Sequence, residues 1–417
     1  MVIIGEKMHI LFIVSNYYPE IHGASHLYQD LAKGFIKSGH KVSVVTSYPR
    51  YYFLQRQDHE KKFRKFENFN GVNVYRTFKI EFSRDNLLLR GIEHLLLPFL
   101  YGSKAFAIKN VDFVIIYSPP LPLYIFGNFF RFLHRSPYIL NVQDLYPKTL
   151  MDVGILTNPI QIKLFKFLEK RAYKTADFIT VHSEGNLTYL HSKGNFEKKS
   201  SVVYNWTDIE EIKPAKKDNN FRSNEDIGNK FLVTYVGIMS THQDLKSVVL
   251  CGKYIMNKEI IIYLIGDGIQ REELIKLAKK EKIQNVKFLP LQSKEKYIEI
   301  LQASDVSIVT LMKDVDTPVV PGKLMKIMSS GTPVLGNVPE KNDTTKIIRE
   351  ANCGIAISPG NPKQLAKTIE WLYSLSKEEL NQLGKNGCLY AKNHFSIDYA
   401  VDQFEQIYEK IHKNYLV

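Results

Sequence analysis

The tetrapeptide Val320-Pro321-Gly322-Lys323 combines residue types that suit a helix start able to bind an anion. Proline presets the first helical turn, and glycine leaves room for a ligand beside the backbone. The N–H groups at a helix start attract phosphate, and the mobile ammonium of Lys323 adds a positive charge. We therefore expect Gly322 and Lys323 to bind a diphosphate; for Lys323 taken alone, a solvent-facing lysine after a turn is the alternative.

Two apolar segments upstream of this tetrapeptide end in glycine: Gly237 closes FLVTYVG, and Gly266-Asp267-Gly268 closes IIYLIGDG. Glycine lets a ligand approach the backbone closely, and a helix start just beyond it attracts phosphate. Such turns are common, so either one alone is weak evidence. In the loop after Gly237, Gln243 can offer an amide hydrogen bond but no charge. Together the segments indicate a binding site for an anion.

The first half of the chain carries a similar turn, Gly23-Ala24-Ser25, between an expected strand and an expected helix. Its amides could face a phosphate, and an ordinary tight turn is the alternative. Asp144 follows an apolar strand, whose carboxyl end should lie at the ligand-binding edge of a parallel sheet. Its carboxylate could bind hydroxyl groups, and a plain helix N-cap is the alternative.

Apolar segments of strand length alternate with segments of helical period, which is typical of parallel sheets wrapped by helices. In the second half the expected strands are 231–237, 261–268, 286–292, 306–311 and 332–336, and the expected helices include 269–281 and 294–303. In the first half the expected strands are 9–14, 41–46, 72–76, 111–117, 138–142, 178–182 and 201–204, with a helix at 27–37. The expected fold is α/β, with two Rossmann-like halves.

The length of 417 residues exceeds one ordinary core, so two domains are expected. We place the first domain at residues 1–208 and the second at 209–395. The polar stretch 205–230 lacks a sustained period and predicts a linker between them. Residues 396–417 have a helical apolar pattern and are expected to pack back onto the first domain.

The formal net charge of +13 is concentrated in residues 1–208, which hold 27 Lys+Arg against 17 Asp+Glu. We expect an anionic partner there but no nucleic acid, because no recognition module accompanies the charge. The three cysteines are far apart and lack metal-ligand spacing, which predicts a reducing, cytoplasmic compartment and no structural zinc. No apolar stretch reaches the roughly 18 residues of a membrane-spanning helix.

Two segments of the first half interrupt the α/β pattern. Residues 48–66 interleave aromatic and basic side chains, and residues 86–101 are leucine-rich with an expected break at Pro98. A solvated basic loop and a buried helix form one interpretation. Peripheral contact with an anionic membrane is the other, and the sequence supports both about equally.

The same motifs recur in a fixed order along the chain. In the second half they are YVGIMSTHQDLKSVV, IGDGIQREEL, NVKFLP, ASDVSIVTL, VVPGKLMKIMSSGTPVLG and CGIAISPGNPKQLAKTI. In the first half they are NYYPEIHGASHLYQDLAKGFIKSGHKVSVVT, NVQDLYP, AYKTADFITVHSEG and VVYNW. This series resembles the family 4 glycosyltransferases, which are retaining enzymes, and is most similar to bacterial enzymes that assemble surface polysaccharides. The resemblance implies the GT-B fold, two Rossmann-like domains with parallel sheets facing across a cleft, the first for the acceptor and the second for a nucleotide sugar.

The resemblance also implies partners and residue roles. The donor would be a sugar on a nucleoside diphosphate, expected to be UDP, and the acceptor a lipid-linked or cell-surface glycan at the inner face of the membrane. The implied donor-binding residues are Gly23, Ala24, Ser25, Gly237, Gln243, Gly266, Asp267, Gly268, Leu291, Gly322, Lys323 and Lys326. The implied catalytic residues are Asp144, Asp316 and Lys323.

The chain departs from this family at a pair of glutamates seven residues apart. Aligned on Lys323, their positions hold Pro318 and Lys326, and an ammonium cannot accept hydrogen bonds from ribose hydroxyls as a carboxylate does. Asp316 could supply a carboxylate near the sugar. Asp314-Val315-Asp316 also spells DxD, the metal-binding string of another glycosyltransferase fold. We interpret it as accidental and expect neither a cofactor nor a metal requirement.

Two alternatives to glycosyl transfer stay open at this point. A nucleotide-sugar 2-epimerase shares the fold and needs no acceptor. A non-catalytic partner protein would keep the fold, lack the ribose-binding glutamate and act as a scaffold for an active transferase.

Overall fold

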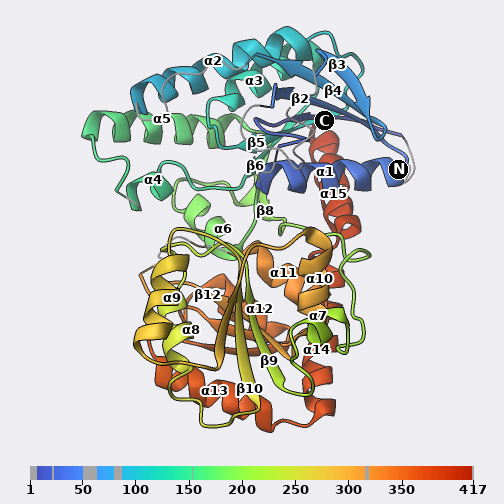
Figure 1. Cartoon of the computed structure of the whole chain (residues 1–417). Coiled ribbons are helices and arrows are strands. Elements are labelled where there is room, and N and C mark those ends of the chain that lie inside the picture. Colours follow the sequence, from blue (N-terminus) through green and yellow to red (C-terminus); the bar gives the residue numbers. More distant parts are fainter. Residues whose placement is uncertain are drawn as a thin grey trace. The chain divides into compact units, whose positions relative to one another are not determined.

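The computed structural model describes residues 7–20, 23–49, 63–78, 87–152, 154–314, 318 and 320–415, with the backbone alone for 87–94 and 414–415. The chain divides into two compact units (Figure 1). Unit 1 comprises Met1–Trp206 and Ile397–Val417, and unit 2 comprises Thr207–Ser396.

The sheet of unit 1 has the strand order β3-β4-β2-β1-β5-β6-β7-β8 among the described residues. Neighbouring strands are parallel except at one edge, where β3 runs antiparallel to β4. The strands are β1 (His9–Ile13), β2 (Lys41–Ser47), β3 (Phe66–Phe69), β4 (Val72–Thr77), β5 (Phe113–Ser118), β6 (Tyr138–Val142), β7 (Phe178–Val181) and β8 (Ser200–Val202).

Helices cover both faces of this sheet, which explains why its central strands are apolar without interruption. In β1, Ile10 and Phe12 pack with α1 and α15, while Leu11 and Ile13 pack in the cluster that α2, α3 and α5 share. The helices of unit 1 are α1 (Gly23–Lys37), α2 (Leu87–Ala105), α3 (Leu123–His134), α4 (Lys148–Asp152), α5 (Pro159–Thr175), α6 (Glu184–His191) and α15 (Ile397–Tyr415).

The C-terminal helix α15 packs along α1. Gly34 of α1 leaves room for it, since a Cβ at this position would lie 2.8 Å from Cγ2 of Val401. Phe404 is fully buried in the same layer. Lys37 pairs with Asp398 at 3.0 Å at the exposed rim of the contact. The chain end is therefore an integral layer of unit 1.

The sheet of unit 2 is parallel, with the strand order β11-β10-β9-β12-β13-β14. The strands are β9 (Phe231–Val236), β10 (Ile260–Ile265), β11 (Val286–Leu289), β12 (Val306–Thr310), β13 (Val334–Asn337) and β14 (Gly354–Ile357). The helices are α7 (Asn220–Asn224), α8 (Leu245–Cys251), α9 (Arg271–Lys280), α10 (Lys294–Ala303), α11 (Gly322–Ser329), α12 (Asp343–Glu350), α13 (Pro362–Ser374) and α14 (Lys377–His394). The two Rossmann-like units confirm the α/β prediction.

Two edge strands escaped the sequence prediction. β3 begins at Phe66, the last residue of the aromatic and basic stretch 48–66, most of which falls outside the described residues. β14 is a half-buried edge strand of only four residues, GIAI. Edge strands bury one side less completely and are correspondingly harder to recognise.

The prediction of a linker at 205–230 is wrong. All of this stretch from Thr207 onward belongs to unit 2, and it contains α7, where the guanidinium of Arg222 is buried. Arg222 donates to Asp305 Oδ2 at 2.6 Å and to the carbonyl oxygens of Ala303, Gly228 and Lys230 at 2.9 Å each. One arginine thus organises a polar segment that hydrophobic periodicity could not detect.

The helix break expected at Pro98 is also wrong, because α2 runs through this residue. Leu97 and Tyr101 on either side are buried, while Leu95 and Phe99 are exposed. Tertiary packing can hold a helix through a proline at the cost of one hydrogen bond. Among the described residues, no helix combines the length and apolar character needed to span a membrane.

In unit 2, glycines bring α14 against the end of α11. A Cβ on Gly384 would overlap the carbonyl oxygen of Gly331, just beyond α11, and a Cβ on Gly387 would lie 3.5 Å from Cα of Met328. The obstacle at Gly384 is main chain, which cannot turn aside as a side chain can. The position of α11 therefore depends on this backbone contact.

We expect Gly384→Ala to lower the free energy of unfolding of unit 2 by about 1–3 kcal/mol, because the added methyl group forces the two helices apart. This loss should exceed the roughly 1 kcal/mol that alanine gains over glycine inside a helix. Urea unfolding followed by circular dichroism measures the change. Asn393→Ala, at an exposed position of the same helix, is the control, and an unchanged or raised stability for Gly384→Ala would contradict the contact.

Candidate functional site

The carboxyl ends of β9 and β10 are joined through glycine main chain. Gly266 and Gly268 both have φ of +147°. A Cβ on Gly266 would overlap the carbonyl oxygen of Gly237, and one on Gly268 would overlap that of Met239. The N–H of Met239 donates to the carbonyl of Asp267 at 2.8 Å. Only glycine permits this approach, so the loops form a surface made largely of backbone.

The side chain of Lys323 lies against this surface. Its Nζ is 3.9 Å from the centroid of the Tyr235 ring in β9, and a Cβ on Gly237 would lie 3.0 Å from Nζ. The atom is buried and has no hydrogen-bond partner among the described residues. The Tyr235 hydroxyl donates to the carbonyl of Ile238 at 2.5 Å, which fixes the ring beneath the amine. The only favourable contact described for the charge is therefore with the ring.

Lys323 stands in the first turn of α11, and no side chain caps that turn. Pro321 occupies the N-cap without a side-chain hydrogen bond, and Gly322 is exposed with no atom within 4 Å of where a Cβ would be. The N–H groups of such a start carry partial positive charge. Backbone dipole and ammonium therefore point to the same kind of ligand, an anion.

Burial lowers the pKa of Lys323 from its ordinary value of 10.5 to about 7, because desolvation disfavours the charged form. An anion beside the amine would favour the charged form and raise this pKa again. A bound phosphate would thus stabilise the charged form of an amine that the ligand-free protein holds partly neutral.

Two neighbouring polar residues serve the loop itself. Oε1 of Gln243 accepts hydrogen bonds from the N–H and hydroxyl of Ser240, at 2.9 and 2.7 Å. Asp244 is buried; it caps α8 and accepts from Asn337 Nδ2 at 3.2 Å and from the Gly360 N–H at 2.6 Å. The oxygen of Gln243 is therefore committed to the turn, and Asp244 ties three loops together.

The remaining predicted donor residues of unit 2 are exposed. Lys326 lies one turn further along α11, with Nζ 5.3 Å from the Tyr297 ring centroid. Asp267 accepts from the Gly268 N–H at 2.8 Å. Leu291, just after β11, is 68% exposed. These positions lie on loops and helix surface where side chains are accessible.

In unit 1, the predicted residues lie where β1 and β6 lead into helices. Gly23 begins α1 with open space around it, while Ala24 and Ser25 are buried, and the Ser25 hydroxyl accepts from Gln29 Nε2 at 2.9 Å. Asp144 is exposed beyond the end of β6. Gly23 and Asp144 are thus accessible, whereas the Ser25 side chain is used internally.

Asp316 lies outside the described residues, as does Val315 of the DxD string. Within the described part of the chain, no cluster of three or more histidine, cysteine, aspartate or glutamate residues could hold a metal ion.

The structure brings together Gly237, Gly266, Gly268 and Lys323, and it adds Tyr235, which sequence reasoning missed. An aromatic residue in an apolar strand is ordinarily predicted to belong to the core. The position of Tyr235 two residues before Gly237 was the only sequence signal for a role in the site. Asp244 was also missed as an organising residue, although an aspartate directly before a helix is a common N-cap signal.

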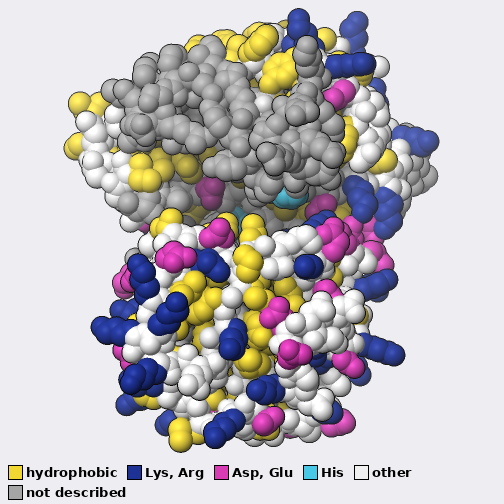
Figure 2. Space-filling view, in the orientation of Figure 1, with side chains coloured by type: hydrophobic (Ala, Val, Ile, Leu, Met, Phe, Trp, Pro, Cys, Tyr) yellow, Lys and Arg dark blue, Asp and Glu magenta, His cyan; other side chains and the backbone are white. Residues whose placement is uncertain are grey.

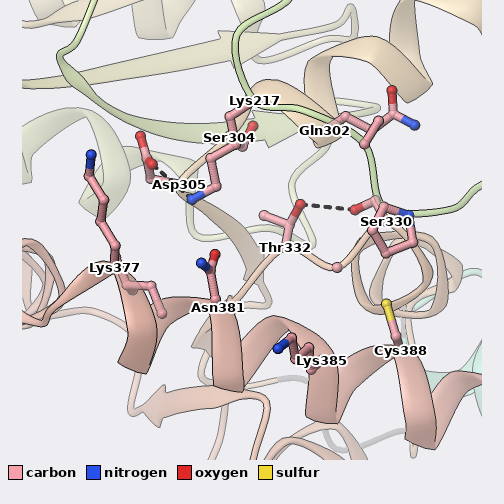
Figure 3. A pocket seen from close by; sticks show the side chains of 14 residues that line it. Lys217, Gln302, Ser304, Asp305, Ser330, Thr332, Lys377, Asn381, Lys385 and Cys388 are labelled. Carbon is pink, nitrogen blue, oxygen red and sulfur yellow. Dashed lines mark hydrogen bonds and ion pairs between the residues drawn. The ribbon is translucent and has the colours of Figure 1, made fainter.

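A separate cavity of about 550 Å³ lies at the opposite edge of the unit 2 sheet, by the amino ends of β12 and β13 (Figure 3). Lys217 Nζ pairs there with Asp305 Oδ1 at 2.9 Å, and the Cys388 thiol donates to the carbonyl of Met328 at 3.2 Å. Lys217, Asp305 and Cys388 thus already have partners, and the cavity is remote from the carboxyl edge near Lys323. We therefore place the functional site at the carboxyl edge.

Two Rossmann-like units, one of them with glycine loops and a buried amine at the carboxyl edge of its sheet, are typical of nucleotide-binding α/β proteins. Residues 216–389 match the family model of glycosyl transferases group 1, and residues 23–206 match that of the glycosyl transferase 4-like domain. The chain belongs to the GT-B glycosyltransferases that combine these two domains, as the sequence predicted.

Curated relatives agree with this assignment. The chain is 25% identical to the probable glycosyltransferase WbjE of Pseudomonas aeruginosa, over 72% of this chain and 76% of the relative. It is 22% identical to the putative colanic acid biosynthesis glycosyl transferase WcaI of Escherichia coli, over 78% of this chain and 82% of the relative.

Solved structures share the fold at lower identity. HepE of Anabaena in complex with UDP has a TM-score of 0.70 at 17% identity, covering 96% of this chain and 99% of the other. WaaG, a glycosyltransferase involved in lipopolysaccharide biosynthesis, has a TM-score of 0.63 at 14% identity, covering 95% and 99%.

Replacing the buried amine should stabilise the ligand-free protein. The unfolded chain restores the ordinary pKa of Lys323, so between about pH 7 and 10.5 the unfolded state binds more protons, and the stability of the wild type rises with pH. Lys323→Met removes this dependence. We expect Lys323→Met to raise the free energy of unfolding most at pH 7 and below, with the gain disappearing towards pH 10.

Urea unfolding at pH 7 and near pH 10 tests this expectation. Lys367→Met, at an exposed position of α13, is the matched control and should show no such gain. A gain for Lys323→Met that is equal at both pH values would show that the amine is not desolvated in the folded protein.

Proposed function

We propose that this glycosyltransferase transfers a sugar, with retention of configuration, from a nucleoside diphosphate to a lipid-linked or cell-surface glycan in bacterial polysaccharide assembly. The observation that carries the proposal is the unpartnered ammonium of Lys323 beside the uncapped start of α11. UDP is the proposed nucleotide; the HepE structures in complex with UDP and with UDP-glucose support this choice. The name of WcaI, a putative colanic acid biosynthesis glycosyl transferase, supports the polysaccharide pathway.

The chemical role of the site follows from where charge develops. When the bond between the sugar and the diphosphate breaks, the leaving diphosphate gains negative charge. Lys323 and the N–H groups of α11 would stabilise that charge in a desolvated setting, where electrostatic interactions are strong. Gly237, Gly266 and Gly268 would let the diphosphate approach the backbone closely.

The acceptor side of the proposal rests on unit 1. Gly23 would close over the donor phosphate, and Asp144 would bind hydroxyl groups of the sugar or acceptor. In retaining transfer of this kind, the departing phosphate itself is thought to take the acceptor proton, which requires no histidine base. Asp316 would add a carboxylate near the sugar.

The ribose contact would differ from the family pattern. Lys326 can donate hydrogen bonds to ribose hydroxyls but cannot accept them, unlike the carboxylate it replaces. The diphosphate would therefore carry a larger part of donor affinity. We also propose that the enzyme works on the cytoplasmic side of the membrane as a peripheral protein, because its acceptor would be presented there.

Lys323→Ala should reduce the rate of sugar transfer by about 10²–10³-fold, because a charge contact to the leaving group is lost. Transfer is measured with a radiolabelled UDP-sugar chosen by thermal-shift screening, since a ligand that binds the native state raises the melting temperature. Lys367→Ala is the matched control. A near-normal rate for Lys323→Ala would refute the assignment, and turnover of UDP-N-acetylglucosamine without acceptor would indicate an epimerase instead.

Transfer should proceed without a divalent metal ion. We propose that Lys323 and the start of α11 supply the positive charge that a metal would supply elsewhere. Activity assayed in EDTA should equal activity in buffer containing Mn²⁺. Loss of activity in EDTA with recovery on adding Mn²⁺ would instead assign a metal role to the carboxylates around Asp314.

A further inference from the structure

Helix α5 of unit 1 exposes a stripe of large apolar side chains. Ile160, Leu164 and Phe167 are 80%, 51% and 56% exposed, and their spacing of four and three residues aligns them along one face. Hydrophobic side chains accordingly reach the surface at the end of unit 1 where Figure 1 labels α4 and α5 (Figure 2). Contiguous apolar stripes of this kind mark contact sites rather than ordinary surface.

The fold of unit 1 does not require this stripe, because a different face of α5 serves the core. Leu168, Ala172 and Tyr173 are buried there. The buried carboxylate of Glu169 accepts from the hydroxyls of Tyr173 and Tyr189, at 3.3 and 3.0 Å. Helix α5 thus carries its exposed apolar stripe directly beside the face that packs against the core, since Leu164 and Leu168 are about one turn apart.

Positive charges accompany the exposed stripe. The exposed basic residues of α5 are Lys163, Lys166, Lys170, Arg171 and Lys174. The guanidinium of Arg171 lies 5.7 Å from the centroid of the Phe167 ring. The one acidic residue of α5 is Glu169, which is buried, so the exposed surface of the helix carries no carboxylate.

The neighbouring helix α3, whose end contacts the C-terminal end of α5, also exposes apolar side chains. Its last turns expose Phe129, Phe132 and Leu133, and Phe132 is 81% exposed. Arg131 holds the two helix ends together, because it donates to the carbonyl of Thr175 at 3.1 Å and to Asp177 at 2.6 Å. Exposed aromatic side chains therefore lie on two helices that are in contact.

We propose that the exposed faces of α5 and the end of α3 dock unit 1 onto an anionic lipid bilayer. Apolar side chains would enter the headgroup boundary, and the lysines would meet lipid phosphates, as in helices that lie in the membrane surface. A protein partner of ordinary composition carries charges of both signs, so it would not explain a helix surface with five cations and no carboxylate. The inference deepens the proposed function, since a lipid-linked acceptor is presented at a bilayer, but the surface itself is independent of the sugar and nucleotide.

Vesicle sedimentation tests the proposal with the full chain. The wild type should sediment with vesicles of phosphatidylcholine and phosphatidylglycerol, much less with phosphatidylcholine alone, and less as salt is raised. The charge variant is Lys163→Glu, Lys166→Glu and Lys170→Glu combined. The apolar variant is Ile160→Ser, Leu164→Ser and Phe167→Ser combined. Each should weaken vesicle binding by about tenfold or more, through lost attraction or lost burial respectively.

A matched charge control comes from unit 2: Lys276→Glu, Lys279→Glu and Lys280→Glu on α9, all exposed. It makes the same change in net charge and should bind vesicles nearly as the wild type does. An equal loss of vesicle binding in this control would show that binding depends on net charge alone, and it would overturn the proposal. Absence of wild-type binding would also overturn it, as would self-association in ultracentrifugation that both α5 variants abolish.

Nucleotide binding separates this inference from the proposed function. The melting-temperature shift with UDP should be the same in the wild type and in both α5 variants, because unit 2 carries the donor site. If vesicle binding behaves as expected while UDP gives no shift, the docking surface stands and the proposed donor fails. If UDP shifts the melting temperature while vesicle binding is absent, the proposed donor stands and the docking surface fails.

Discussion

The buried ammonium of Lys323 is the constraint on which the site depends. A charged group without a hydrogen-bond partner is costly in a folded protein, and here the Tyr235 ring is its closest described support. The surrounding elements keep the amine in place: β9 supplies the ring, Gly237 supplies space, and α11 supplies the backbone that carries Lys323. Contact between α11 and α14 then fixes that backbone. Stability and function are opposed at this point, as is common where a protein is preorganised for a charged ligand.

The sequence predicted the main features of this site because they are local. The glycines at the strand ends and the Pro-Gly-Lys helix start can be recognised from residue types within a few positions. Tyr235 could not be recognised, because its role depends on how β9 lies relative to α11, which are distant in sequence. The same limit explains Arg222, whose carbonyl and carboxylate partners come from the residues after α7, the end of α10 and the residue before β12.

Helix α5 shows a different limit of sequence reasoning. Periodicity reveals that apolar residues share a helix face, but it does not say whether that face meets the core or solvent. Leu164 and Leu168 are four residues apart and would ordinarily be assigned together, yet one is exposed and the other buried. The membrane interpretation drawn from the sequence rested on residues 48–66 and 86–101. In the structure, α2 within the second segment exposes Leu95 and Phe99, and exposed apolar and basic side chains are also described on α3 and α5.

The glycine loops at the carboxyl edge of unit 2 separate the position of the backbone from the choice of side chains, two properties that usually change together. Their main chain cannot move without collision, since Gly266 lies against Gly237 and Gly268 against Met239. The same loops nevertheless expose Ile238 and Ile269, at 68% and 81%. Substitutions at these two positions alter the shape and polarity of the rim while leaving the backbone untouched. Single side-chain exchanges can therefore diversify the rim of these loops without rebuilding the backbone platform beneath it.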